Sequence, residues 1–144
     1  MRAVLDTNVV VSATLIRGGN EDRILRSWQH GRFELVLSPN ILQEIGRVLL
    51  YEKLQRYRWM SEQEVVLFLE LLAQECHLVL GNIEVHASRD PADDKFLAAA
   101  LEGKARYVVS GDKDLLALKK YRNVQIITPA VFLKILERAE KKKG

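Results

Sequence analysis

The chain has few of the residues on which disulfide, zinc or thiol chemistry depends. Cys76 is the only cysteine among 144 residues, so no disulfide can form within the chain and nothing favours an oxidising compartment. The three histidines, His30, His77 and His86, lack the close spacing of a zinc site. We expect Cys76 to be a small buried apolar residue and the histidines to serve packing or the surface.

Long apolar runs and phosphate-binding loops are also absent from the sequence. No run approaches the roughly 18 apolar residues of a membrane span. The first ten residues, MRAVLDTNVV, contain an acid where a signal peptide would continue its apolar stretch. The pair Gly18-Gly19 belongs to no glycine-rich nucleotide motif. These absences predict a soluble, cytoplasmic protein with no membrane association and no nucleotide cofactor.

Composition is that of a folded protein with a mild excess of positive charge. A hydrophobic content of 48% and a length of 144 residues predict one domain spanning residues 1–144. The formal net charge of +3 and the pI near 9.1 are compatible with a polyanionic partner. They do not identify one, because part of the charge lies in the terminal lysines 141–143.

Short apolar runs typical of strands alternate with amphipathic stretches typical of helices. The predicted strands are residues 2–5, 33–37, 76–80, 105–110 and 124–128. The predicted helices are residues 21–31, 39–49, 51–75, 90–103, 112–118 and 129–143. This alternation predicts an α/β fold with a mostly parallel central sheet.

The helical stretch 51–75 is long enough for two helices. Ser61 followed by Glu64 resembles a capping box and predicts that the second helix begins there. We therefore expect a helical insert at about residues 51–75.

Carboxylates follow the predicted strands at the edge where parallel sheets bind ligands. Asp6 ends the first strand, and Asp112 follows the fourth. Asp94 lies in the first turn of the helix that leads into the fourth strand, and Glu44 lies in the helix after the second. We expect these four side chains to approach one another.

Each acid also has a local explanation. Asp6 and Asp112 can cap the helices that follow them, Asp94 can complement a helix N-terminus, and a solvated position would suit Glu44. Together, however, converging carboxylates repel one another unless a cation neutralises them. Ligation by oxygen alone suits Mg²⁺ or Mn²⁺.

Four stretches in the same order resemble the PIN-domain ribonucleases, particularly the VapC-like toxins of prokaryotic toxin–antitoxin modules. They are VLDTNVVVSA, SPNILQEIGRVL, SRDPADDKFLAAALEGKARYVVSGDKDLLAL and IITPAVFL, and they cover nearly the whole chain. The resemblance implies a three-layer α/β/α fold, a mostly parallel sheet of about five strands, and an acidic Mg²⁺ or Mn²⁺ site that hydrolyses RNA.

The resemblance also implies roles for individual residues. It implies that the catalytic, metal-binding acids are Asp6, Glu44, Asp94 and Asp112. Asn8 and Ser110 match the polar residues that support such ligands, and Asp93 and Asp114 are possible auxiliary acids. The cations closest in sequence to the acids are Arg17, Lys95 and Lys113, each of which a solvated surface position would also explain.

The implied partners are an RNA substrate, a small antitoxin protein and a second copy of the chain in a homodimer. The insert at 51–75 is larger than a minimal PIN domain needs, and it could serve as an RNA clamp, a dimer surface or an antitoxin dock. For its aromatic residues we favour an interface role; they are Tyr51, Tyr57, Trp59 and Phe68.

Three other functions compete with the ribonuclease. An aspartyl-phosphate phosphatase would need a second acid at position 8, where the sequence has Asn8. A phosphorylation receiver would need an acid pair at the first strand and a lysine after the last strand, where the sequence reads VQIITPA. A catalytically silent PIN-like module that binds RNA or protein remains an alternative, although the presence of all four acids argues against it.

Overall fold

The computed structural model describes residues 1–51 and 57–143. Its strands are β1 (Arg2–Leu5), β2 (Glu34–Leu37), β3 (His77–Leu78), β4 (Tyr107–Val109), β5 (Lys120–Tyr121) and β6 (Val124–Ile127). Its helices are α1 (Thr7–Leu15), α2 (Asn20–Gln29), α3 (Pro39–Leu49), α5 (Glu62–Glu75), the 3₁₀ turn η1 (Pro91–Asp93), α6 (Asp94–Glu102), α7 (Lys113–Ala117) and α8 (Pro129–Lys143).

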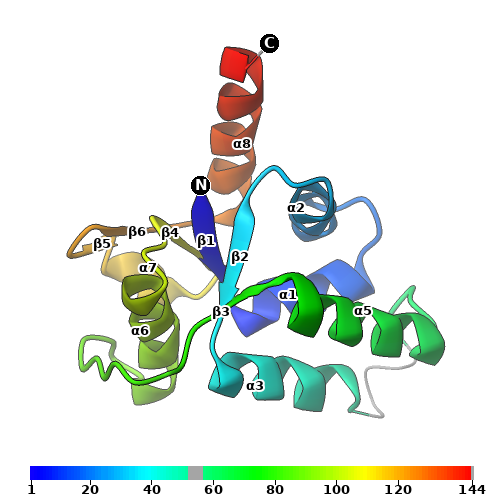
Figure 1. Cartoon of the computed structure of the whole chain (residues 1–144), viewed down its shortest axis with the longest axis horizontal. Coiled ribbons are helices and arrows are strands. Elements are labelled where there is room, and N and C mark those ends of the chain that lie inside the picture. The colour runs from blue at the N-terminus through cyan, green and yellow to red at the C-terminus, as the bar shows by residue number, and fades with distance from the viewer. Residues whose placement is uncertain (52–56, 144) are drawn as a thin grey trace.

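The strands form one sheet in the order β3-β2-β1-β4-β6-β5, with helices around it (Figure 1). Every neighbouring pair is parallel except β5 and β6. The predicted α/β/α fold with a mostly parallel sheet is therefore confirmed. The five predicted strands are present, and the short antiparallel strand β5 adds a sixth, which the sequence analysis did not predict.

The central strands are apolar because helices cover them. Ala3, Val4 and Leu5 of β1 and Val108 and Val109 of β4 are fully buried. Strands buried on both faces read as continuous apolar runs, which explains why the first and fourth strands could be predicted from the sequence.

Three strands of the sheet end at the same level. Leu5 pairs with Val109, and Val109 pairs with Ile127. The register continues one residue further, because the amide of Asp6 donates to the carbonyl of Val109 at 2.9 Å. Asp6 and Ser110 therefore leave the sheet side by side.

Helices α6 and α8 connect the sheet to the rest of the core. Helix α6 lies against β1, β2, β4 and β6. On α8, Phe132 meets the ring of Phe33 edge-on, with ring centroids 5.0 Å apart. Figure 1 shows α8 at the opposite end of the molecule from α3.

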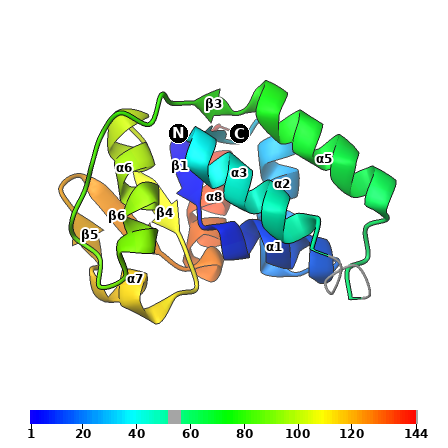
Figure 2. The ribbon, with the colours of Figure 1, turned by 90° about the horizontal axis from the view of Figure 1, so that it is seen from below.

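A long segment without regular structure follows β3 and runs along α6 to η1 (Figure 2). The carboxylate of Glu102, near the end of α6, accepts hydrogen bonds from the amides of Gly81 and Asn82, both at 2.9 Å. These bonds hold the start of the segment against α6.

The second half of the predicted insert is confirmed as α5. Its N-terminus is the predicted capping box, in which Ser61 Oγ accepts from the amide of Glu64 at 3.2 Å and Glu64 Oε1 from the amide of Ser61 at 3.3 Å. The helix predicted before it falls largely on residues 52–56, outside the described part of the chain.

The aromatic residues of the insert have different environments. Phe68 is buried in the core, so the interface role expected for it is wrong. Trp59 Nε1 donates to the carbonyl of Ala13 at 2.8 Å, which ties this part of the chain to α1. Tyr51 and Tyr57 are exposed.

Within residues 1–51 and 57–143, no helix is long and apolar enough to cross a membrane.

Candidate active site

Asp6 lies at the junction of β1 and α1 and is only 4% exposed. Its Oδ1 accepts from the amide of Asn8 at 3.2 Å, which caps α1, and its Oδ2 accepts from Ser110 Oγ at 2.7 Å. Burial raises the pKa of Asp6, the bonds from Ser110 and Asn8 oppose that rise, and the charges of Asp112 and Glu44 add to it. One carboxylate thus caps a helix and faces other acids.

Ser110 joins the two acids that follow β1 and β4. Its fully buried hydroxyl donates to Asp6 and accepts from the amide of Asp112 at 2.9 Å. The hydroxyl oxygen accepts from the Asp112 amide through a lone pair, and the hydroxyl proton is donated to the Asp6 carboxylate. Asp112 in turn caps α7 by accepting from the amide of Asp114 at 2.7 Å.

Asp93, at the end of η1, faces the same acids. Its pKa is raised to about 6, first by burial and then by the charges of Asp112, Asp6 and Asp90. The charge of Lys95 acts in the opposite direction. Asp93 therefore belongs to a cluster with Asp6 and Asp112, which we call the aspartate cluster.

Asp94 has a different role from Asp93. It is 8% exposed, and its Oδ1 accepts from the amides of Ala87 at 3.1 Å and Ser88 at 2.7 Å. Burial favours the neutral acid, but these hydrogen bonds outweigh it and lower the pKa of Asp94. Its carboxylate therefore holds the end of the segment that runs along α6.

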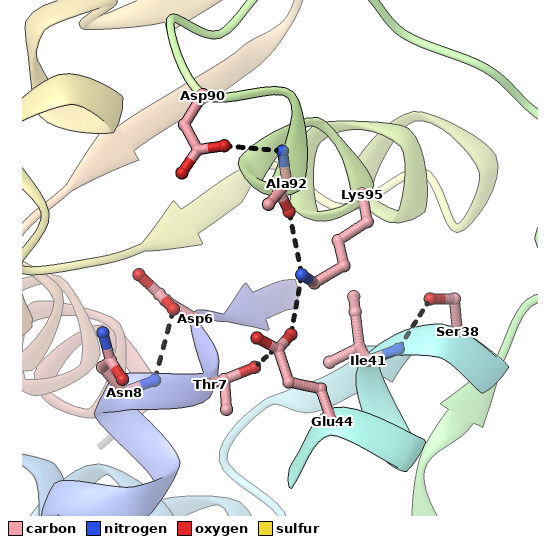
Figure 3. A network of polar contacts seen from close by, with 9 residues as sticks. All are labelled: Asp6, Thr7, Asn8, Ser38, Ile41, Glu44, Asp90, Ala92 and Lys95. Carbon is pink, nitrogen blue, oxygen red and sulfur yellow. Dashed lines mark hydrogen bonds and ion pairs between the residues drawn. The ribbon is translucent and has the colours of Figure 1, made fainter. Parts of the chain in front are cut away.

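Glu44 extends from α3 toward Thr7 and Lys95, beside Asp6 (Figure 3). Its Oε2 accepts from Thr7 Oγ1 at 3.0 Å and lies 2.7 Å from Lys95 Nζ. Lys95 also donates to the carbonyl of Ala92 at 2.8 Å. Glu44 and Lys95 are thus paired rather than solvated, and sequence reasoning missed both this pair and the contact with Thr7.

The structure brings some of the predicted residues together and separates others. Ser110 donates to the carboxylate of Asp6 and accepts from the backbone amide of Asp112, and Glu44 accepts from Thr7, the residue after Asp6. Asn8 contributes its backbone amide, while its side chain is exposed. Asp114 is exposed and lies 3.7 Å from Arg89. The ligand roles predicted for these residues remain predictions.

The donor set of the cluster suits a hard cation. Asp6, Asp93 and Asp112 offer only oxygen atoms, and their mutual repulsion favours bound positive charge. In the part of the chain that the structure describes, no group of three His, Cys, Asp or Glu side chains is arranged to hold a metal ion as it stands. The fit to Mg²⁺ or Mn²⁺ thus lies in the chemistry of the oxygen donors and not in a preformed arrangement of ligands.

A hollow of about 280 Å³ opens beside Asp112. It is lined by Asn8, Val9, Ser12, Glu21, Gly111 and Asp112. A ligand in this hollow would contact the cluster from the side of α1 and would meet mainly polar groups.

Comparison with known proteins places the chain in a family. Residues 2–114 match the model of the PIN domain. The uncharacterized protein MJ1680 of Methanocaldococcus jannaschii is 32% identical over 146 aligned positions, which cover 96% of this chain and 93% of that protein. PIN domains are generally nucleases. The chain therefore belongs to the PIN-domain family, and this membership indicates a nuclease.

Proposed function

We propose that the protein is a metal-dependent ribonuclease that hydrolyses RNA phosphodiester bonds at the aspartate cluster. The observation that carries the proposal is the meeting of the ends of β1 and β4, where Ser110 donates to the carboxylate of Asp6 and accepts from the amide of Asp112. Carboxylates that repel one another favour a bound cation. A divalent cation promotes phosphodiester hydrolysis by activating a water molecule and by neutralising charge on the phosphate oxygens.

The principal ligands in this proposal are Asp6, Asp93 and Asp112. Asp94, assigned as a ligand by resemblance, instead holds the segment before η1 through its two amide contacts. Glu44 shapes the acidic margin of the site. This assignment keeps Asp6 and Asp112 as the resemblance implies, replaces Asp94 with its neighbour, and gives Glu44 no direct bond to the metal.

The chain's own groups orient the site. When bound, Mg²⁺ or Mn²⁺ would lower the pKa of a coordinated water and neutralise charge on the phosphate. Ser110 fixes the orientation of the Asp6 carboxylate and, through the amide of Asp112, the turn that carries the third acid. The hollow beside Asp112 leaves room for the nucleotide next to the scissile bond.

RNA as the substrate is supported by the family and by the charge of the chain. An acidic site repels phosphate, so attraction must come from cations elsewhere on the surface. The net charge of +3 supplies that excess, and Lys113 is exposed directly beside Asp112.

The decisive experiment is cleavage of a panel of single-stranded and structured RNAs by the purified protein with Mg²⁺ or Mn²⁺. We expect cleavage that EDTA abolishes and that Asp6→Asn reduces by more than about 100-fold, beyond the effect of changing an outer metal partner. Asp22→Asn is the matched control, since Asp22 is also buried but contacts Gly18 and Arg26 outside the cluster. Cleavage that persists in EDTA and in Asp6→Asn would contradict the proposal.

The cellular role we propose is that of the toxin in a toxin–antitoxin pair, acting in the cytoplasm as a homodimer. This role rests on the resemblance to VapC-like toxins. Expression of the chain should arrest bacterial growth, and Asp6→Asn should not. Co-expression of a small antitoxin encoded beside the gene should relieve the arrest.

The second candidate is a PIN-like module that binds RNA without cleaving it. The observation that favours it is the pairing of Glu44 with Lys95, which leaves one of the expected acids neutralised. Binding of both Mn²⁺ and RNA, with no turnover across the panel, would favour this candidate over the ribonuclease.

A further inference from the structure

The pair of Glu44 and Lys95 joins four elements beside Asp6 (Figure 3). Glu44 comes from α3 and accepts from Thr7 at the start of α1. Lys95 comes from α6 and donates to the carbonyl of Ala92 in η1. The lysine therefore links α3 to the turn that carries Asp93.

The pair is well satisfied within the protein. Glu44 Oε2 has two donors, Thr7 Oγ1 at 3.0 Å and Lys95 Nζ at 2.7 Å. The side chain of Glu44 is 26% exposed and that of Lys95 is 23% exposed. Removing one partner of a largely buried pair leaves the other charge uncompensated, which makes the pair costly to break.

Pairing changes the number of carboxylates that are free to hold metal. Glu44 and Lys95 cancel one another's charge, which leaves the three acids of the aspartate cluster. One divalent cation offsets most of that charge, and Mg²⁺ commonly binds through only one or two carboxylates and retains several waters. A second ion at Glu44 would have to displace the ammonium group of Lys95.

We propose that Lys95 takes the place of a second metal ion, so that the protein without RNA binds one divalent cation, at the aspartate cluster and not at Glu44. Lys95 is a positioning residue in this proposal, because it acts through Glu44 and through the carbonyl of Ala92. The inference rests on the proposed metal-dependent function and specifies the stoichiometry of that site.

The test is Mn²⁺ binding to the full chain without RNA, with free Mn²⁺ measured by electron paramagnetic resonance. The wild type should bind one Mn²⁺. Glu44→Gln should change the affinity by less than the roughly tenfold that loss of a metal partner typically costs. Lys95→Met frees the Glu44 carboxylate and should add a second Mn²⁺, whereas Lys95→Met/Glu44→Gln should return the count to one.

Lys95→Arg preserves the ion pair, so this variant should bind a single Mn²⁺. If Lys95 had only a structural role, the number of bound Mn²⁺ ions would not depend on the charge at position 95. Thermal unfolding of each variant verifies folding. Should Lys95→Met not fold, the Mn²⁺ count of the wild type and the Mn²⁺ affinity of Glu44→Gln carry the test, with the double variant, which lacks both charges, as the control for folding.

Different failures have different meanings. Two Mn²⁺ on the wild type, or a loss of about tenfold or more in affinity with Glu44→Gln, would overturn the inference and leave the ribonuclease proposal standing. An unchanged count of one in Lys95→Met would also overturn the inference. Absence of any Mn²⁺ binding to the wild type would overturn both the inference and the metal-dependent function.

Discussion

Asp93 and Asp94 are adjacent in the chain and have opposite electrostatic environments. Asp93 faces Asp112 and Asp6 and has its pKa raised to about 6, first by burial and then by those charges. Asp94 is hydrogen-bonded by two amides, which lower its pKa despite its burial. A raised pKa means that ionised Asp93 destabilises the folded protein, while a lowered pKa means that ionised Asp94 stabilises it.

Paired substitutions to asparagine should therefore have opposite effects. Asp93→Asn removes a repelled charge, so the metal-free protein should be as stable as the wild type or more stable, while RNA cleavage falls by more than about 100-fold. Asp94→Asn weakens two charge-assisted hydrogen bonds and should lower the free energy of unfolding by about 1–3 kcal/mol. Urea unfolding and cleavage at 25 °C measure the two effects.

The pair discriminates between the two possible ligands. Well below its unfolding temperature the Asp94→Asn protein is folded despite its lower stability. We expect it to retain cleavage within about tenfold of the wild type under these conditions, which separates a role in stability from a role in metal binding. A greater loss of cleavage in Asp94→Asn than in Asp93→Asn would restore the ligand role that the resemblance assigns to Asp94.

Ser110 is the residue on which the geometry between Asp6 and Asp112 depends. Ser110→Ala removes the donor to Asp6 and the acceptor for the amide of Asp112, so cleavage should fall by about 10–100-fold, as for other outer partners of metal ligands. Ser110→Thr keeps the hydroxyl and should retain most of the activity. Equal activities of the alanine and threonine variants would show that the hydroxyl has no part in the site.

At the scale of elements, the sheet and most helices could be predicted from the sequence. The runs at β1, β2 and β4 are apolar because both faces of these strands are covered, whereas buried and partly exposed residues alternate along β6. Ser38, Ser61 and Asp112 each cap the helix that follows. These features depend on residues that are close together in the sequence, so apolar runs and capping residues were sufficient to predict them.

Features that depend on distant contacts could not be predicted in this way. Strand β5 is only two residues long, Lys120–Tyr121, and exists because it pairs with β6. Which of two neighbouring aspartates faces Asp6 depends on the 3₁₀ turn before α6. The contact of Lys95 with Glu44 joins residues 51 positions apart, and neither residue type predicts the other.

The end of α6 packs tightly against β2 at Gly103. A Cβ added there would lie 2.6 Å from Val36 Cγ1 and 3.2 Å from the carbonyl of Ala99. Val36 is fully buried and β-branched, so it cannot move aside easily. Gly103→Ala should lower the free energy of unfolding by about 1–3 kcal/mol through overpacking.

Gly46 provides the matched control for this substitution. It lies within α3, and an added Cβ would meet nothing within 4 Å. Gly46→Ala should raise the free energy of unfolding by about 0.5–1 kcal/mol, because alanine restricts the unfolded chain. Urea unfolding compares both variants with the wild type. Equal effects of the two changes would mean that contact with Val36 does not limit position 103.

For the whole molecule, the arrangement of charge sets how RNA reaches the site. Several surface cations are already engaged within the protein, including Arg2 with Glu34, Arg23 with Glu137 and Arg32 with Glu140. The net charge of +3 is what remains to attract a polyanion toward a site that is itself acidic. Binding should therefore depend on a small number of phosphate contacts.

The salt dependence of RNA binding measures that number. Each phosphate contact on single-stranded RNA contributes about −0.7 to the slope of log affinity against log salt, so three contacts predict a slope of about −2. Raising KCl from about 50 to 200 mM at saturating Mg²⁺ should then weaken binding roughly tenfold or more. We expect the loss in KM and not in kcat, because surface cations act before the bond is cleaved. Fluorescence anisotropy with Asp6→Asn separates binding from cleavage, and a slope near zero would show that phosphate contacts do not hold the RNA.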